Sequence, residues 1–539
     1  MKRGNFIFYF LVFFFYTSGI AWATDLNESG TLKLTGKIQT RGTIRTEDSE
    51  GFTSPQVDAG ELVQHRNLLY LELNHNLDNS FRDSGWQVKY HLLGRFLYEG
   101  IYDYGPSVWQ DVRDANKDEI DDFKWDADLW EGYLDLSKGP FFLRTGRQNL
   151  AWGETDVFRL LDGINPLDNT FGGIFEDLDD RRIPLWMVRG TYDIGTIGLF
   201  SSLTLEGFVA PTIGDTKDRV APIAPPDTPY YPPIPSFENT IGANVPPDLL
   251  PLLASLNVSD TDISPDNDIS NWRWGVRMGS IIGDNLTVTL AHYKTYPDNP
   301  TVRLRYDNFS TIDIPTGFPP PFPPTVPVDI PQQITVESVF QDIQVTGGSF
   351  NFYNMNLDVV FRGEVAWFWD EPVFIPSKNT PFPNIPAGEF SFNNGEISTK
   401  NFLRYAIGLD KNLWIRKLNP AKTFFVSFQY FGSWMQDYDS DIVSPLVDPD
   451  TGNYVTVKRD EHTFTGLINT EFLRGNLIPE VVVAYDVVGN WLFQPSVEYK
   501  WGNPLRLKLQ YSSIEANSLS GFGAFRDRDQ VSLTLSVLF

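Results

Sequence analysis

Apolar and polar residues alternate with a period of two in the last stretch of the chain, residues 526–539. One set of positions is apolar and comprises Val531, Leu533, Leu535, Val537 and Phe539. The positions between them are Gln530, Ser532, Thr534, Ser536 and Leu538, of which only the last is apolar. A period of two places neighbouring side chains on opposite faces, so this stretch predicts a β-strand with one apolar face.

The same alternation recurs along the chain and predicts eighteen strands. Their expected ranges are 31–46, 61–77, 85–98, 124–137, 141–149, 182–193, 198–210, 271–282, 286–296, 334–353, 356–369, 399–414, 421–435, 456–474, 477–488, 490–500, 504–514 and 526–539. Each range is about long enough for a tilted strand that crosses a bilayer in roughly 9–11 residues. Such strands need only one apolar face, which fits a chain that is 14% aromatic and still mildly polar overall.

Short and long connections alternate between the expected strands. The long ones are 99–123, 150–181, 211–270, 297–333, 370–398, 436–455 and 515–525, and short turns such as 138–140 and 501–503 separate them. Periplasmic turns and extracellular loops of outer-membrane barrels alternate in this way. We therefore predict an all-β fold with a single transmembrane antiparallel β-barrel of about 18 strands, with 16 or 20 as alternatives because the number must be even.

Residues 1–23 have the pattern of a secretory signal peptide. Lys2 and Arg3 precede an apolar run from Phe6 to Tyr16, and small residues at Ala21 and Ala23 suit cleavage. The run is too short to span a bilayer as a helix, which takes roughly 20 residues. We expect an exported chain whose mature barrel occupies residues 24–539 in the outer membrane.

The formal net charge of −26 and the absence of cysteine exclude several classes of function. So acidic a chain is a poor general partner for nucleic acid or anionic lipid headgroups. Without cysteine it has no disulfide, thiolate metal site, thiol nucleophile or attached c-type haem. Its five histidines lie in no catalytic or zinc-binding motif. We predict no enzymatic activity and no cofactor apart from calcium.

Three of the long connections are rich in proline, namely 211–270, 297–333 and 370–398. Proline cannot donate a ladder hydrogen bond and favours extended polyproline geometry. We expect passive surface loops outside the membrane, with binding of aromatic-rich partners as the alternative. Residues Leu249 to Leu256 are expected to form a short helix in the longest of these loops.

Oxygen-bearing side chains in the connection 99–123 suggest a metal site. Asp114, Asn116, Asp118 and Asp122 stand at positions 1, 3, 5 and 9 of a short loop, a spacing typical of loops that wrap calcium. Glu119 replaces the usual glycine and Trp125 the usual bidentate glutamate. The hypothesis is a calcium site that stiffens the loop, and a solvated acidic loop is the alternative.

The connection 150–181, here called the insert, is both apolar and charged. Its apolar residues Trp152, Phe158, Leu160, Leu161, Ile164, Leu167, Phe171, Ile174 and Phe175 are too many to lie in water. As the third outer connection, it is expected to pack inside the barrel or against its rim, because the third loop of general porins folds into the lumen. The predicted constriction residues are Arg144, Arg147, Gln148, Trp152, Glu154, Arg159, Asn165, Asp168, Arg182 and Arg189. They form either a salt-bridge network that holds the insert or an eyelet that selects the solute.

A pattern of residues around the insert resembles a known family. It comprises Arg144-x-Gly146-Arg147-Gln148, Trp152-Gly153-Glu154, Ile164-Asn165-Pro166-Leu167-Asp168, Arg182-x-Pro184 and Arg189-x2-Tyr192. The pattern is similar to that of the Gram-negative outer-membrane family known as domain of unknown function 1302, and more distantly to alginate-export barrels. The resemblance implies a porin-like outer-membrane barrel that moves hydrophobic or lipid-like compounds.

Together these observations predict a porin-like channel for passive passage of a small or hydrophobic, lipid-like solute. The alternative is a structural scaffold or sheath around an electron-transfer or adhesion partner, which needs an empty lumen. The expected partners are outer-membrane lipid, the solute and the barrel assembly machinery, which recognises a final strand that ends on an aromatic residue such as Phe539.

Overall fold

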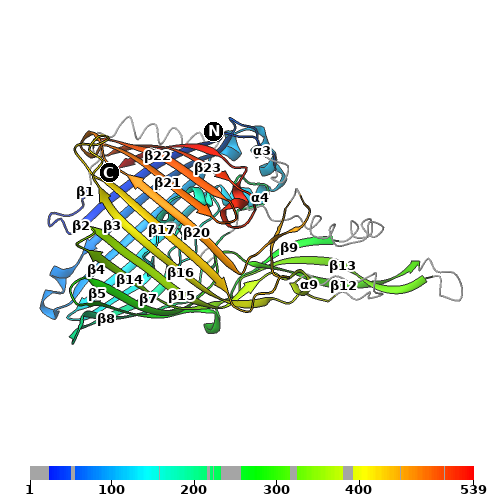
Figure 1. The fold of residues 1–539 in the computed structure, drawn as a ribbon, viewed down its shortest axis with the longest axis horizontal. Coiled ribbons are helices and arrows are strands. Elements are labelled where there is room, and N and C mark those ends of the chain that lie inside the picture. The colour runs from blue at the N-terminus through cyan, green and yellow to red at the C-terminus, as the bar shows by residue number, and fades with distance from the viewer. Residues whose placement is uncertain are drawn as a thin grey trace.

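The structure is a computed structural model that describes residues 24–49, 55–156, 158–214, 219–222, 224–231, 257–315, 325–379, 393–448, 451–502 and 504–539. Within these residues, eighteen antiparallel strands form one closed β-barrel (Figure 1). The ring closes where the last strand, β24, pairs with β2, and the two-residue strand β1 (Thr24–Asp25) pairs antiparallel with the N-terminal end of β2. The predicted fold class and strand number are confirmed.

The barrel strands follow the chain in order around the ring. They are β2 (Leu32–Arg45), β3 (Leu62–Asn76), β4 (Gln87–Glu99), β5 (Trp125–Lys138), β6 (Phe141–Gln148), β7 (Leu185–Ile197), β8 (Phe200–Ala210), β10 (Arg273–Ile282), β11 (Leu286–Thr295), β14 (Ile343–Asn354), β15 (Val359–Val373), β16 (Ser398–Leu413), β17 (Phe424–Met435), β20 (Asp460–Asn469), β21 (Leu477–Asp486), β22 (Trp491–Trp501), β23 (Leu505–Glu515) and β24 (Gln530–Leu538). Each overlaps one of the predicted ranges.

The outer face of the barrel is apolar. Val188 on β7 pairs with Val209 on β8, and Tyr192 pairs with Leu205, and all four side chains are exposed. An exposed apolar band on a closed barrel is the surface that lipid covers, because every backbone group of the ring is paired with a neighbouring strand. Among the described residues, no helix is long and apolar enough to cross a membrane. The closed ring and its apolar outer face are those of an outer-membrane β-barrel, which crosses the bilayer with its strands.

The long connections gather at one end of the barrel, together with the short β21–β22 turn, and the other short turns lie at the opposite end (Figure 1). The connection between β4 and β5 carries the helices α2 (Ile101–Tyr104), α3 (Ser107–Ala115) and α4 (Lys117–Phe123), and the one between β23 and β24 carries the 3-10 helix η8 (Gly521–Phe525). The connection between β6 and β7 is the third at this end, after those between β2 and β3 and between β4 and β5, as predicted. It contains the insert.

The prediction that the proline-rich connections are loops throughout is wrong. β9 (Asn257–Ile263), β12 (Thr301–Pro315) and β13 (Thr325–Val339) form a separate three-stranded sheet that extends away from the barrel (Figure 1). Pro327 and Pro331 lie on β13, but before Gln333, where β9 begins to pair with it. Proline is tolerated there because β13 is an edge strand over that stretch.

The same sheet explains one error in the strand ranges. Residues 334–353 were predicted as one strand, but 334–339 belong to β13 and the barrel strand β14 begins at Ile343. Apolar residues alternate at Ile334 and Val336 before the break and at Ile343 and Val345 after it, so the alternation changes phase where one strand ends and the next begins. The helix expected at Leu249–Leu256 lies outside the described residues.

Candidate functional site

The insert leaves β6, runs through 3-10 helix η3 (Gly173–Phe175) and helix α5 (Leu178–Arg181), and returns to β7. Asn165 joins its first and last residues: its side chain accepts from Leu150 N at 2.9 Å and donates to Ile183 O at 2.7 Å. Asn165 is 1% exposed. A buried amide that satisfies main-chain groups on both sides fixes the base of the insert in one geometry.

One side of the insert is fastened to β15 through Glu364, which is almost fully buried. The Glu364 carboxylate accepts hydrogen bonds from three main-chain N–H groups of the insert, those of Glu154, Thr155 at 3.0 Å and Leu161 at 2.9 Å. Its neighbour Arg362 donates to the Glu154 carbonyl and pairs with Asp156. Hydrogen bonds to charged groups are the stronger ones, so this contact defines where the insert meets the wall.

Trp152 anchors the same side by apolar contact. Its indole N–H donates to Glu206 on β8 at 3.2 Å, and its ring meets Phe208 and Tyr293 edge to face at 5.3 and 5.9 Å. The Tyr293 hydroxyl on β11 donates to Leu161 O at 3.1 Å. These residues belong to a large interior core that also includes side chains of β7, β14, β16 and β17.

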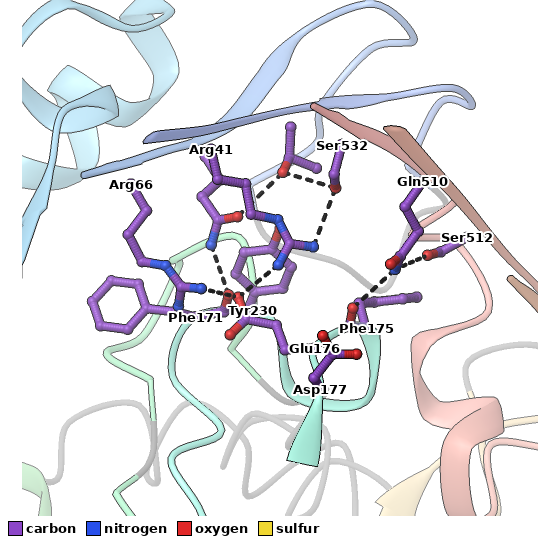
Figure 2. A network of polar contacts seen from close by, with 12 residues as sticks. Arg41, Arg66, Phe171, Phe175, Glu176, Asp177, Tyr230, Gln510, Ser512 and Ser532 are labelled. Atoms are coloured by element: carbon purple, nitrogen blue, oxygen red, sulfur yellow. Dashed lines mark hydrogen bonds and ion pairs between the residues drawn. The ribbon is translucent and has the colours of Figure 1, made fainter. Parts of the chain in front are cut away.

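The tip of the insert reaches a different part of the wall (Figure 2). Glu176 pairs with Arg66 on β3 at 2.6 Å and with Arg41 on β2 at 3.3 Å, and its side chain is 5% exposed. Gln510 on β23 donates to Phe175 O at 3.1 Å. Figure 2 shows both guanidinium groups converging on the Glu176 carboxylate.

These contacts require the insert to cross the barrel interior. Counted around the ring from β2, β3 is the second strand and β15 is the eleventh of eighteen, so they face each other. The segment between Leu161 and Glu176 therefore bridges opposite walls. Smaller apolar clusters flank its tip, one around Phe171 with Leu68 and Leu97, another around Phe175. Packed side chains of the insert therefore lie between the two walls.

A small pocket remains between the tip of the insert and the wall formed by β3 and β4. Its lining consists of Arg66, Leu68, Tyr70, Arg95 and Leu97 from the wall, and Asp168, Phe171, Glu176 and Asp180 from the insert. Its empty volume is about 310 Å³, a figure that includes space open to solvent. Arginines on the wall thus face carboxylates on the insert across an apolar floor.

The predicted constriction residues on the strands are held in the wall. Arg144 binds both carboxylate oxygens of Asp135 at 2.7 and 2.9 Å, and Arg189 pairs with Glu206 at 2.6 Å. Arg147 is 3% exposed and pairs with Asp128 at 2.6 Å. Gln148 is fully buried and donates to Met187 O at 3.2 Å. None of these four side chains lines the pocket at the tip.

Most predicted residues of the insert brace its own fold. Arg159 donates to Asn165 O at 2.6 Å and pairs with Asp298, and Arg182 pairs with Asp162 and, at 2.8 Å, with Asp179. Burial raises the pKa of Asp162, an effect that the Arg182 guanidinium opposes. Glu154 contributes its main chain to the Glu364 and Arg362 contacts. Asp168 alone among the ten lines the pocket, where its carboxylate also caps Thr170 N at 3.0 Å.

The residues that join the insert to the two walls were not among the predicted constriction residues. They are Arg41, Arg66 and Glu176 at the tip and Glu364 on the opposite wall, and Arg95 lines the pocket beside the tip. One signal for them exists in the sequence: Arg41, Arg66 and Arg95 stand inside expected strands, where an arginine facing lipid would cost roughly 2–4 kcal/mol. Strand arginines therefore had to face the lumen.

The predicted calcium loop does not form. Asp114 lies at the end of α3, Asn116 follows it, and Asp118 and Asp122 lie on α4, so the segment is helical instead of wrapping around an ion. Asp114 pairs with Arg113 at 2.7 Å. In the part of the chain that the structure describes, no group of three or more acidic or histidine side chains is arranged to hold a metal. The spacing matched, but the residues lie on two short helices and the junction between them instead of in a loop that wraps an ion.

Charged residues also gather at the outer end of the seam between β2 and β24. Asp529 N donates to Glu47 Oε1 at 2.9 Å, and Thr46 N donates to Asp529 O at 2.9 Å. Arg45 donates to the main-chain carbonyl of Arg528 at 2.8 Å, and both arginines are at most 4% exposed. Burial, together with repulsion from Asp529, raises the pKa of Glu47 to about 7.

This pKa gives a pH dependence with a definite sign. The folded chain binds the Glu47 proton more tightly than the unfolded chain, whose glutamate titrates near 4.5, so stability falls as pH rises from 4.5 through about 7. In denaturant unfolding, the wild-type midpoint should match that of Glu47→Gln at low pH and drop below it at about pH 8. A constant difference between the two proteins across this range would contradict the assignment.

The sequence matches a family model described as "Protein of unknown function (DUF1302)" over residues 10–539. No curated protein matches it. Similar solved structures include Pseudomonas aeruginosa OccK9 (OpdG), with 11% identity over 94% of this chain and 98% of that chain and a TM-score of 0.46. Acinetobacter baumannii OccAB1 has 11% identity over 97% and 99%, with a TM-score of 0.45. Pseudomonas aeruginosa OccK2 (OpdF), solved in complex with glucuronate, has 9% identity over 94% and 98%, with a TM-score of 0.44.

Sequence identities this low do not indicate which solute the chain passes. The family match, by contrast, does show which family the chain belongs to, because it extends over nearly the whole sequence, including the insert and every barrel strand. The predicted family resemblance is thereby confirmed, while the distant likeness to alginate-export barrels stays a prediction. The chain belongs to the DUF1302 family of proteins of unknown function.

Proposed function

We propose that the protein is a passive outer-membrane channel in which the insert narrows the lumen and the pocket at its tip selects the solute. The observation that supports this most is the anchoring of one segment to opposite walls, by Glu364 on one side and Glu176 on the other. A fixed crossbar leaves a passage of defined size and charge beside it. Constrictions of this kind select by diameter and by the charges that line them.

The composition of the pocket favours a small amphipathic solute. Leu68, Leu97 and Phe171 supply an apolar surface, while Arg66 and Arg95 face Glu176 and Asp180. Phe123 stacks on Phe171 at 4.6 Å and continues the apolar surface toward the outer end. A solute with an apolar body and one or two polar groups could replace water on both kinds of surface.

Removing the insert provides the test. In a variant with residues 155–178 replaced by a short Gly-Ser linker, we expect single-channel conductance in planar bilayers to rise severalfold, because the crossbar is gone. The matched control shortens the β12–β13 hairpin by deleting residues 309–331. That hairpin projects away from the barrel, so its loss should leave conductance unchanged (Figure 1).

Two outcomes would overturn the proposal. One is refolded wild-type protein that shows neither conductance nor solute flux while the insert deletion is equally silent. The other is an insert deletion that folds, as shown by heat-modifiable migration in gels, and conducts like the wild type. Either result would mean that the insert does not control a passage.

A sheath around an electron-transfer or adhesion partner is the competing function. Such a sheath needs room for the partner inside the ring, and the insert places Trp152, Leu161 and Phe175 in that space. No feature of the described residues favours it over a channel. Copurification of a haem protein with the intact barrel would reverse this preference.

A further inference from the structure

A proline-rich segment crosses the outer mouth of the barrel above the insert. It comprises the described residues 219–222 and 224–231, here called the strap. At one end Arg273, the first residue of β10, donates to Arg219 O at 2.5 Å. Next to this contact, Val220 is 1% exposed and packs with Tyr296 and Phe340, which lie just beyond β11 and β13.

The other end of the strap is held at the seam that closes the ring. Arg45, the last residue of β2, donates to Pro229 O at 3.0 Å, and Arg528 donates to Tyr231 O at 2.6 Å. β2 and β24 are the first and eighteenth strands, whereas β10 and β11 are the eighth and ninth. The strap therefore spans the mouth from one side of the ring to the other.

Tyr230 joins the strap to the insert below it. Its side chain is 4% exposed, its hydroxyl donates to Gln530 Oε1 at 3.2 Å, and its ring belongs to the apolar cluster around Phe175 at the tip of the insert. Figure 2 shows Tyr230 beside Glu176 and Arg41. The strap thus covers the tip that forms one side of the pocket.

The way in which the strap is held allows it to detach as a unit. Its described residues pair in no β-strand with the wall, and the anchoring arginines bind it through two main-chain carbonyl groups and through the face of the Tyr230 ring, over which Arg45 lies at 5.8 Å. Pro222, Pro225, Pro226 and Pro229 stiffen it, because each proline fixes one backbone dihedral angle. A stiff segment held at its ends opens or closes as a whole.

We propose that the strap is a lid over the outer mouth, which Arg45 and Arg528 hold closed at the β2–β24 seam and which opens by detaching Tyr230 from the insert tip. The inference rests on the proposed channel for its conductance test. It does not rest on the channel for its first test, which measures exposure of the strap itself. Gln530 and Phe175 form the site that Tyr230 leaves.

The natural chain lacks cysteine, so single thiols report on the strap without background. Thr228 is 3% exposed, whereas Pro226 in the same strap is exposed. With a water-soluble maleimide, we expect the thiol of Thr228→Cys to react about tenfold more slowly than that of Pro226→Cys. Adding Arg45→Gln and Arg528→Gln should remove most of this difference. Equal rates in the parent background, or no acceleration by the two arginine substitutions, would overturn the lid.

A matched pair of substitutions controls for the lost charge. Arg416→Gln and Arg474→Gln change two exposed arginines in turns at the other end of the barrel, and they should leave the Thr228→Cys rate unchanged. Equal acceleration by this pair would also contradict the lid, because it would show that loss of positive charge anywhere is sufficient.

Conductance then tests whether the lid controls passage. Tyr230→Cys and Gln530→Cys can be joined by a short bifunctional methanethiosulfonate reagent and released by a reductant. We expect joining to lower conductance by about half or more, and reduction to restore it. The cysteine-free parent treated in the same way is the control. Unchanged conductance of the joined protein, in a preparation whose parent conducts, would overturn the lid and leave the channel intact; a silent parent would instead count against the channel.

Discussion

Glu176→Gln is expected to detach the tip of the insert and to shift the selectivity of the barrel toward anions. The substitution keeps the size of the side chain but removes the charge that Arg41 and Arg66 share. Two nearly buried guanidinium groups would then lose the carboxylate with which they pair, and breaking a buried pair costs roughly 3–5 kcal/mol. Denaturant unfolding should show that loss, and the reversal potential in a salt gradient should move toward the anion potential.

Asp177→Asn serves as the matched control for this experiment. Asp177 follows Glu176 directly and carries the same charge, but its side chain is 72% exposed and pairs with Lys508 only at 3.4 Å. Exposed pairs of this type contribute about 1 kcal/mol or less. If the two variants proved equal in stability and selectivity, the pairing of Glu176 with the wall would have no special role.

Glu364→Gln is expected to loosen the opposite end of the crossbar. The carboxylate uses both oxygens to accept from three main-chain N–H groups of the insert, and an amide can offer only one oxygen. The amide nitrogen would face at least one N–H group, a donor against a donor, at a cost of roughly 3 kcal/mol. Amide hydrogen exchange at Thr155 and Leu161 should accelerate by about two orders of magnitude.

A second carboxylate of the same strand separates this effect from general destabilisation of β15. Glu371 binds both guanidinium nitrogens of Arg404 at 2.7 Å and has no contact with the insert among the described hydrogen bonds. Glu371→Gln should lower stability without exposing the Thr155 and Leu161 amides. Exchange that rises equally in both variants would show that Glu364 does not hold the insert.

The strands could be predicted from the sequence because lipid imposes a simple rule on each of them. Every strand that crosses the bilayer must present an apolar face, so the period of two is visible one strand at a time. The insert was also predictable, since Trp152, Leu161 and Phe175 have no place in a water-exposed loop. Both the alternation of a strand and the apolar character of the insert can be recognised in a short stretch of sequence, without knowing which residues contact it in the fold.

The contacts that define the site depend on neighbours that are distant in sequence. Arg41 and Glu176 are separated by 135 residues, and Leu161 and Glu364 by 203. Which lumen charge meets which insert charge follows from the closure of the ring, and no local pattern encodes it. For the same reason, the prolines of β13 predicted a loop: the sequence does not show that this part of β13 lies at the edge of a sheet, where proline is tolerated.

The misplaced calcium loop and the overlooked strap have a common cause. Asp114, Asn116 and Asp118 have the sequence spacing of calcium ligands, but the two short helices on and between which they lie determine where their side chains point. Proline content gave residues 211–270 the character of a surface loop, but buried arginines at the rim bind its carbonyl groups. In each case the sequence identified the type of residue correctly but did not show which other parts of the chain surround it.

The insert also has a mechanical consequence. A ring of strands alone can flatten when the surrounding bilayer is stretched, whereas a ring joined along a diameter resists a change of shape. Because Glu364 and Glu176 fix the two ends of such a strut, the cross-section of the lumen is set by the protein and not by lateral tension in the membrane. Conductance should accordingly be insensitive to osmotic stress across the bilayer.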